Sequence, residues 1–241
     1  MKYYVASMTA ILRGKITEYP RLYAYPSAPE FIGNKFVVLD SGAFSLSMKG
    51  KEIDDEHIRK LGLHYIKHNA SDSGNVLAIA PDVFLSPEKS MANFVKIQKL
   101  YPALRTIPVL QSKRKKKIDL YGTMQQLKFY KTYNIKSICI SNPSLLACEA
   151  LEQGIEDVVS ECRSTLGKDI WIHILGAGWN AHDVRMWGTL DINSIDSIAY
   201  YSDAVAQKTW RHLSADVFNL NADTVELALN NLKIANQIIN Y

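Results

Sequence analysis

A short apolar run that ends in an acid and a glycine turn indicates the fold class of this sequence. Val37-Val38-Leu39 is followed directly by Asp40-Ser41-Gly42-Ala43-Phe44. A short run rich in branched apolar residues is typical of a strand buried on both faces of a parallel sheet. Asp40 then falls at the carboxyl end of the strand, where parallel α/β enzymes hold their active-site residues.

The same arrangement recurs three times further along the chain. The polar residues that end or follow these runs are Asp82 after residues 76–80, Gln111 after residues 106–110, and Asp196 within residues 194–198. The carboxyl ends of parallel strands gather at one end of a barrel or one edge of a sheet. We therefore expect these three side chains and Asp40 to surround one pocket.

Short apolar runs alternate with amphipathic segments along the whole chain. The expected strands are residues 3–6, 36–39, 76–80, 106–110, 137–140, 170–175, 194–198 and, less regular, 217–220. The expected helices are residues 54–68, 87–100, 119–133, 144–164, 181–187 and 223–239. Such alternation builds parallel βαβ units, and about eight strands in this length favour a barrel. The sequence predicts an α/β fold, a (β/α)8 TIM-type barrel, as a single domain over residues 1–241.

Two segments outside the expected pocket also carry a pattern. Residues 19–29 are rich in Tyr, Pro, Ser and Ala, which predicts a loop between the first two strands. The loop is long enough for a lid or a binding loop, and irregular packing over the barrel is the other interpretation. The last helix is expected to turn one apolar face to the core, formed by Val225, Leu229, Leu232, Ala235 and Ile239.

The composition is that of an ordinary globular protein. With 47% hydrophobic and 22% charged residues among 241, the chain can bury a sizeable core. No apolar run approaches the roughly 20 residues of a membrane helix, and residues 1–6 do not read as a secretory signal. We expect a cytoplasmic protein that does not contact a membrane. Cys139, Cys148 and Cys162 lack metal-ligand spacing, so neither a metal site nor a disulfide framework is expected.

A basic run lies close behind Gln111. Lys113-Arg114-Lys115-Lys116-Lys117 concentrates the positive charge of a chain whose net charge is only +4. One interpretation is a solvated loop, since charge runs commonly cover exposed surface. The other is a loop that contacts phosphates at the rim of the pocket. The sequence leaves both open.

Five segments in chain order resemble motifs of the tRNA-guanine transglycosylases. Asp40-Ser41-Gly42-Ala43-Phe44 is similar to the Asp-Ser-Gly-Gly-Phe motif of that family. Asp82 resembles the acid with which the family recognises the base, and Ile107-Pro108-Val109-Leu110-Gln111 resembles its Val-Gln-Gly strand end. His173-Ile174-Leu175-Gly176-Ala177-Gly178 is similar to its Leu-Met-Gly-Val-Gly turn. Ser194-Ile195-Asp196-Ser197 is similar to its Met-Phe-Asp-Cys segment. The resemblance spans about residues 36 to 203.

The chain also departs from the family in three places. The Cys-rich zinc site near the C-terminus is missing, so no zinc subdomain is expected. Ser141-Asn142-Pro143-Ser144 stands where the family has a Gly-Gly-Leu-Ala-Val-Gly turn, and Ala199-Tyr200-Tyr201-Ser202-Asp203 where it has Pro-Thr-Arg. A short chain without zinc is more similar to the phage and bacterial relatives that insert 7-deazaguanines into DNA. A phage-encoded protein would then act in the host cytoplasm.

The resemblance implies a base exchange that needs no cofactor and no metal. Guanine in DNA, or alternatively in tRNA, would be replaced by a 7-deazaguanine base of the preQ0 kind. Asp196 would attack C1′ of the sugar as the nucleophile, and Asp40 would accept a proton from the incoming base. Asp191 and Asp203 lie close to Asp196 in sequence, but Asp196 is the one expected within a strand.

The remaining site residues are expected to bind the base or the polynucleotide. A carboxylate at Asp82 suits the N1 and 2-amino donors of guanine, and the Gln111 amide suits O6 or a 7-substituent. The expected substrate-binding residues are Ser41, Gly42, Phe44, Asp82, Gln111, His173 and Gly176. His173 has a second interpretation as a hydrogen-bonded residue of the barrel interior. The expected nucleic-acid contacts are Lys113, Arg114, Lys115, Lys116, Lys117, Arg185 and Arg211, with Trp187 and Trp210 as aromatic candidates.

Two other classes of function fit the same residues. The first is a hydrolase or lyase of the barrel type that uses the acids as an acid–base pair on a small molecule. The second is a nucleic-acid-binding protein without catalysis, which the presence of both Asp40 and Asp196 disfavours. The identity of the 7-substituent, the sequence context and the oligomeric state are left open by the sequence.

Overall fold

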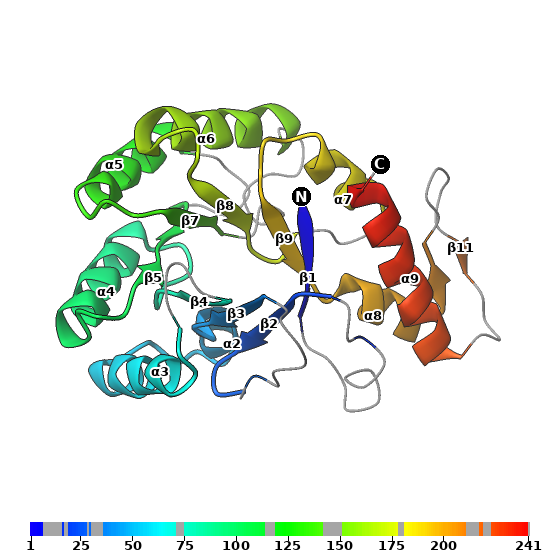
Figure 1. The fold of residues 1–241 in the computed structure, drawn as a ribbon, viewed down its shortest axis with the longest axis horizontal. Coiled ribbons are helices and arrows are strands. Elements are labelled where there is room, and N and C mark those ends of the chain that lie inside the picture. Colours follow the sequence, from blue (N-terminus) through cyan, green and yellow to red (C-terminus); the bar gives the residue numbers. More distant parts are fainter. Residues whose placement is uncertain are drawn as a thin grey trace.

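The computed structural model describes residues 1–6, 16, 19–27, 29, 36–70, 75–113, 119–141, 151–177, 181–210, 217–218 and 223–240. Parallel strands form the centre of the molecule and helices lie around them (Figure 1). The strands of this sheet are β1 (Lys2–Ala6), β2 (Arg21–Ala24), β3 (Val37–Asp40), β4 (Val76–Ile79), β5 (Thr106–Ile107), β6 (Val109–Leu110), β7 (Ser137–Ile140), β8 (Trp171–Ile174) and β9 (Ser194–Ser197).

The sheet closes on itself through one proline. The order of hydrogen-bonded strands is β5-β4-β3-β2-β1-β9-β8-β7-β6, so β5 and β6 occupy its two ends. These two strands are halves of one run, separated only by Pro108. The Ile107 carbonyl accepts from Ala80 N at 2.8 Å on one side, and the Pro108 carbonyl accepts from Cys139 N at 2.9 Å on the other. The predicted α/β barrel of the TIM type is therefore confirmed.

The helices follow the strands along the chain. They are α2 (Ala43–Met48), α3 (Asp55–Lys67), α4 (Pro87–Leu100), α5 (Leu120–Lys131), α6 (Leu151–Leu166), α7 (Ala181–Gly188), α8 (Ala199–Val205) and α9 (Thr224–Ile239). Local sequence sets several of their starts. The side chains of Asp54, Asp119 and Asp223 accept hydrogen bonds from backbone N–H groups in the first turns of α3, α5 and α9. Among the described residues, no helix has the length and apolar character needed to cross a membrane.

The eighth strand of the barrel comes from the segment predicted as a loop. β2 lies within residues 19–29 and pairs with both β1 and β3. Its four residues lie between prolines and include the buried Arg21, which donates to the Ile16 carbonyl at 2.7 Å. The strand predicted at residues 217–220 does not enter the barrel. Val217–Phe218 (β11) pairs antiparallel with Lys208–Thr209 (β10) in a separate two-stranded sheet.

The barrel interior is a packed apolar core that ends in polar side chains. The buried residues of this core are Tyr4, Ala6, Leu22, Val38, Leu77, Ile79, Ile107, Val109 and Cys139. Side chains of a strand alternate between its two faces, so the next inward position is two residues further on. Val38 is thus followed by Asp40, and Val109 by Gln111. The interior core therefore becomes the floor of a polar site at the carboxyl ends of the strands.

Candidate active site

A cavity of about 520 Å³ opens at the carboxyl ends of the barrel strands. Its size lies within the range of small-molecule sites. The lining residues are Leu22, Ala24, Asp40, Phe44, Ser45, Asp82, Phe84, Gln111, Ser141, Leu175, Gly176, Asp196, Ser197, Ile198, Ala199, Ser202 and Asp203. The four polar residues that the sequence pattern predicts at one pocket all belong to this wall. None of the described lining residues is Lys or Arg.

Asp40 carries the clearest electrostatic perturbation of the site. Its carboxylate ends β3 and accepts a hydrogen bond from Gly42 N at 3.1 Å. Burial first, and then the negative charges of Asp82 and Asp196, raise the pKa of Asp40 to about 7 against the opposing effect of hydrogen bonds from Gly42 and Ser41. A carboxyl group with this pKa can both release and accept a proton near neutral pH.

The Asp82 carboxylate is fixed by side chains from two segments. Ser41 Oγ donates to its Oδ1 at 3.0 Å, and Gln111 Nε2 donates to its Oδ2 at 2.6 Å. Burial raises the pKa of Asp82, and these two hydrogen bonds oppose the rise. Gln111 is fixed in turn by Gln126 of α5, because the Gln111 backbone exchanges two hydrogen bonds with the Gln126 side chain at 3.0 and 2.9 Å.

This network changes the direct contacts expected for two of the substrate-binding residues. Ser41 is fully buried and contacts the Asp82 carboxylate instead of lining the cavity. Gln111 does line the cavity, but its amide is engaged by protein, since its Oε1 accepts from Leu85 N at 3.3 Å and its Nε2 donates to Asp82. Both residues therefore orient the Asp82 carboxylate that lines the cavity.

Asp196 projects from β9 between a histidine and a backbone amide. His173 Nε2 lies 3.0 Å from its Oδ1, and Gly176 N donates to the same oxygen at 2.9 Å. His173 is fully buried and is not part of the cavity wall, so it contacts Asp196 in place of a ligand. Its interpretation as a hydrogen-bonded residue of the barrel interior is the one the structure supports.

The start of α2 brings an aromatic ring to the mouth. Gly42 has φ 74°, a left-handed conformation that costs glycine little, and it precedes the first residue of α2. Phe44 follows, is 55% exposed, and lines the cavity. The Phe84 ring lies edge-on to it, with centroids 6.2 Å apart. A flat, apolar ligand could stack on such a ring.

The predicted nucleic-acid contacts have different outcomes. Lys113 follows the lining residue Gln111 by two positions and forms an exposed ion pair with Glu88 at 2.5 Å. Arg185 lies in the last turn of α7, which ends near Met1 at the opposite end of the barrel, so it does not flank the cavity. Trp187 and Trp210 are buried in the core and offer no ring to a nucleic acid. Arg114, Lys115, Lys116, Lys117 and Arg211 lie outside the described residues.

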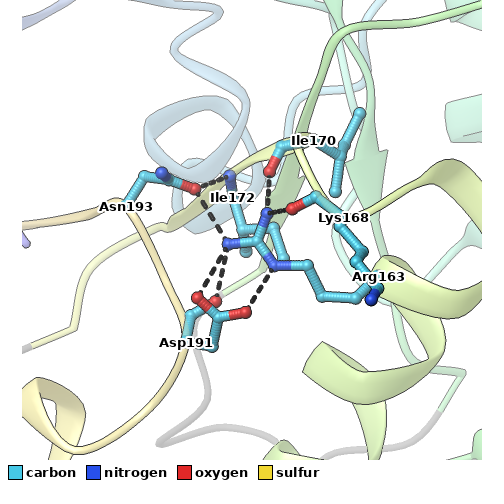
Figure 2. Close-up of polar contacts among 6 residues, drawn as sticks. All are labelled: Arg163, Lys168, Ile170, Ile172, Asp191 and Asn193. Carbon is cyan, nitrogen blue, oxygen red and sulfur yellow. Dashed lines mark hydrogen bonds and ion pairs between the residues drawn. The ribbon is translucent and has the colours of Figure 1, made fainter.

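The two acids that compete with Asp196 lie in different places. Asp191 is at the opposite end of the barrel, where it pairs with Arg163 at 3.0 Å (Figure 2). Asp203 of α8 does line the cavity, and its Oδ2 accepts from Trp210 Nε1 at 2.6 Å. Sequence reasoning did not predict the lining residues Phe84, Ser141, Ile198, Ser202 and Asp203. Phe84 had a usable signal, because it follows Asp82 by two residues.

Metal-ligating side chains do not gather at the described part of the site. Within the described ranges, no group of three or more His, Cys, Asp or Glu side chains is placed to hold a metal ion. Cys139 and Cys162 are buried as free thiols, and burial raises the pKa of Cys162 to about 12. The described wall of the cavity carries carboxylates, an amide, hydroxyls and aromatic rings.

The fold and the site define the class of this protein as an α/β barrel with an acidic, ligand-sized cavity at the carboxyl ends of its strands. No protein-family model matches the chain, and a search among curated proteins finds no significant match. The function is therefore inferred from the geometry and chemistry of the cavity.

Proposed function

We propose that the protein is a guanine transglycosylase, a pentosyltransferase that exchanges guanine in DNA for a 7-deazaguanine base. The observation that carries the proposal is the meeting of Asp40, Asp82 and Asp196 in one cavity, each with a different environment. Base exchange needs three acidic functions, a nucleophile, a proton carrier and a reader of the purine edge. The cavity supplies one carboxylate for each.

Asp196 is suited to the nucleophile. Breaking an N-glycosidic bond builds positive charge at C1′, which a carboxylate below the sugar stabilises and then captures. An Asp196 oxygen would bond to C1′ as the C1′–N9 bond breaks, and the bonding electron pair would go to N9 of the departing guanine. His173 and Gly176 hold one oxygen of the carboxylate from below and leave the other for this bond.

Asp40 is suited to the proton carrier. With a pKa of about 7 it is present in both forms near neutral pH. Its protonated form would give the proton to the leaving guanine, and the resulting carboxylate would take the N9 proton of the incoming base. N9 of that base would then attack C1′, and the Asp196 carboxylate would be released unchanged. The two half-reactions thus return both acids to their starting state.

Asp82 is suited to reading the base. Each of its oxygens accepts one protein hydrogen bond, and a carboxylate has about four acceptor sites in total. The remaining sites can accept from N1 and the 2-amino group of guanine. Phe44 supplies a stacking surface at the same wall. Because no described lining residue is cationic, phosphates would stay outside while the base and sugar enter.

The target base must leave its stack to reach such a cavity. Enzymes that act on a base flip it out of the duplex or take it from a single strand. Lys113, two residues after the lining residue Gln111, is one described cation that could face the backbone once its exposed pair with Glu88 opens. Exposed ion pairs of this kind contribute at most about 1 kcal/mol, so the rearrangement is inexpensive.

The test is the incorporation of labelled guanine or preQ0 into polymeric substrates. The wild-type protein is expected to label DNA, and Asp196→Asn to lower the rate by roughly 10³-fold or more, as losses of a nucleophile do. Asp191→Asn is the matched control, since Asp191 is a nearby acid at the opposite end of the barrel. Its exchange rate should equal that of the wild type.

The other outcomes are informative. Labelling of tRNA alone would support the base exchange but show that its substrate is tRNA and not DNA. Labelling of neither polymer would contradict the proposal and favour a barrel hydrolase or lyase on a small molecule. An Asp196→Asn variant that exchanges base at the wild-type rate would remove this residue from the reaction.

A further inference from the structure

A buried histidine links Asp196 to the strand behind it. His173 of β8 stands opposite Ser194 of β9 in the strand register, and Asp196 lies two residues further on the same inward face. His173 Nδ1 is 2.9 Å from Ser194 Oγ, and Nε2 is 3.0 Å from Asp196 Oδ1. Both ring nitrogens are thus engaged by β9.

The ring itself has little freedom to move. Trp171 stacks on it with centroids 5.3 Å apart and planes within 2°, and Tyr4 meets it edge-on at 5.6 Å. Tyr4 is also the residue of β1 that pairs with Asp196. The imidazole is therefore held by one aromatic face and one aromatic edge in a close-packed interior.

The hydrogen-bond chemistry fixes which nitrogen carries the proton. An ionised carboxylate only accepts, so Nε2 must be the donor to Oδ1. Nδ1 can accept from the Ser194 hydroxyl or donate to it, and either arrangement keeps the proton on Nε2. Oδ1 therefore receives two donors, from His173 and from Gly176. Among the described residues no hydrogen bond reaches Oδ2 of Asp196.

We infer that His173 is a positioning residue that, with Ser194 behind it, fixes one oxygen of Asp196 and aims the other at the substrate. Its effect on turnover rests on the proposed function, whereas the pairing itself does not. A carboxylate held at one oxygen cannot rotate away from C1′ between the two half-reactions. Preorganisation of this kind acts on the chemical step more than on ground-state binding.

Kinetics test the consequence for turnover. His173→Leu should lower kcat for base exchange and the single-turnover rate of the covalent enzyme–DNA adduct by roughly 10–100-fold. The KM for the free base should change less than about twofold, because Asp82 and Gln111 are untouched. His173→Gln, whose amide can still donate, should recover part of the loss. His68→Leu, at the C-terminal cap of the outer helix α3, is the control and should match the wild type.

Nitrogen NMR tests the pairing without relying on activity. In protein labelled with ¹⁵N-histidine, the His173 signals are assigned by their loss in His173→Gln. We expect a protonated Nε2 through the neutral pH range, a shift of Nε2 in Asp196→Asn, and a shift of Nδ1 in Ser194→Ala. Asp191→Asn should leave both signals in place. The Ser194→Ala variant keeps the ring, so the test survives if His173→Leu does not fold.

The results separate the two proposals. A wild-type enzyme that exchanges bases, together with a His173→Leu variant of unchanged kcat, would overturn the positioning role and leave the function standing. If the wild-type protein shows no exchange but the Nε2 signal of His173 shifts in Asp196→Asn, the proposed function is wrong and the pairing of His173 with Asp196 is supported. An unprotonated Nε2, or one indifferent to Asp196→Asn, would overturn the inference directly.

Discussion

The Asp40 side chain couples the chemistry of the cavity to the stability of the fold. Its pKa of about 7 arises first from burial and then from two neighbouring carboxylates. Burying Asp40 beside other acids opposes its ionisation, so the folded state holds a proton that the unfolded chain releases. The arrangement that suits proton transfer near neutral pH is therefore a source of instability above it.

The sign of this coupling can be measured. Between the ordinary pKa of 3.8 and about 7, the folded protein binds more protons at Asp40 than the unfolded chain. The free energy of unfolding should then fall as pH rises through this window and level off above it. Asp40→Asn, which mimics the protonated acid, should be more stable than the wild type at about pH 8 by roughly 2–4 kcal/mol.

Urea unfolding at a series of pH values gives this comparison. The stability difference should shrink towards zero as the pH falls below 3.8, where the wild-type carboxyl becomes protonated in both states. Asp169→Asn, an exposed acid before β8, controls for the change of net charge. A difference between Asp40→Asn and the wild type that stays constant with pH would contradict the raised pKa of Asp40.

Residue identity alone predicted much of the site. Asp40, Asp82, Gln111 and Asp196 each stand at or just after the end of an apolar run, and the structure places all four at one cavity. The residues that hydrogen-bond these four side chains or their backbone could not be predicted in the same way. The Gln126 side chain binds the Gln111 backbone from a separate helix, and no local pattern marks such a tertiary hydrogen bond.

Among the elements, α2 is tied to the cavity through a single glycine. A Cβ added at Gly42 would lie 2.7 Å from the Tyr25 carbonyl oxygen, so the loops after β2 and β3 touch at this point. Tyr25 N also donates to the Asp40 carbonyl at 2.9 Å. The position of Phe44, two residues beyond Gly42, thus depends on a contact that only glycine permits.

Gly42→Ala tests this contact. The variant combines a left-handed φ with a backbone clash, and we expect it to lose about 1–3 kcal/mol of unfolding free energy and to bind base more weakly. Gly50→Ala is the matched control, because Gly50 has a similar φ of 64° with nothing within 4 Å of the added Cβ. Thermal unfolding and base titration of the two variants isolate the clash. Equal losses in both would show that the contact with Tyr25 is unimportant.

Element prediction failed where packing overrides local pattern. β2 carries a buried arginine between prolines, so neither its composition nor its length reads as a barrel strand. The last helix and its apolar face were predicted correctly, since Leu232 and Ala235 are buried and Val225, Leu229 and Ile239 pack against the core. Its buried residues also include Leu227, Ala228 and Asn231, which the prediction lacked. Asn231 is buried because it accepts from Trp210 N and donates to the Tyr200 and Lys208 carbonyls. Apolar periodicity cannot show a polar residue used in this way.

At the scale of the whole molecule, the two ends of the barrel do different work. The carboxyl end holds the cavity, whereas the amino end of β8 and β9 is fastened by Arg163 of α6 (Figure 2). The Arg163 guanidinium donates to the Lys168, Ile170 and Asp191 carbonyls and pairs with the Asp191 carboxylate. In this fold the residues at the carboxyl ends of the strands usually form the active site, and those at the amino ends usually stabilise the barrel.

Replacing Arg163 should therefore affect stability alone. Arg163→Met leaves several carbonyls and a carboxylate without their donor, and we expect a loss of about 2–4 kcal/mol of unfolding free energy. Arg163→Lys keeps the charge without the planar fork and should lose less. The exchange rate per folded molecule at 25 °C should match the wild type in both. A fall in kcat that exceeds the unfolded fraction would show that the amino end influences the cavity.

The proline between β5 and β6 has a consequence for how copies of the protein can meet. The Ile107 carbonyl accepts from the strand on one side and the Pro108 carbonyl from the strand on the other. The described barrel therefore presents no unpaired β-edge along its circumference. Addition of a strand from another polypeptide, a frequent route by which sheets self-associate, is closed to it. Any assembly that forms around the described barrel must then use its helices, its loops or the separate β10–β11 sheet as the meeting surface.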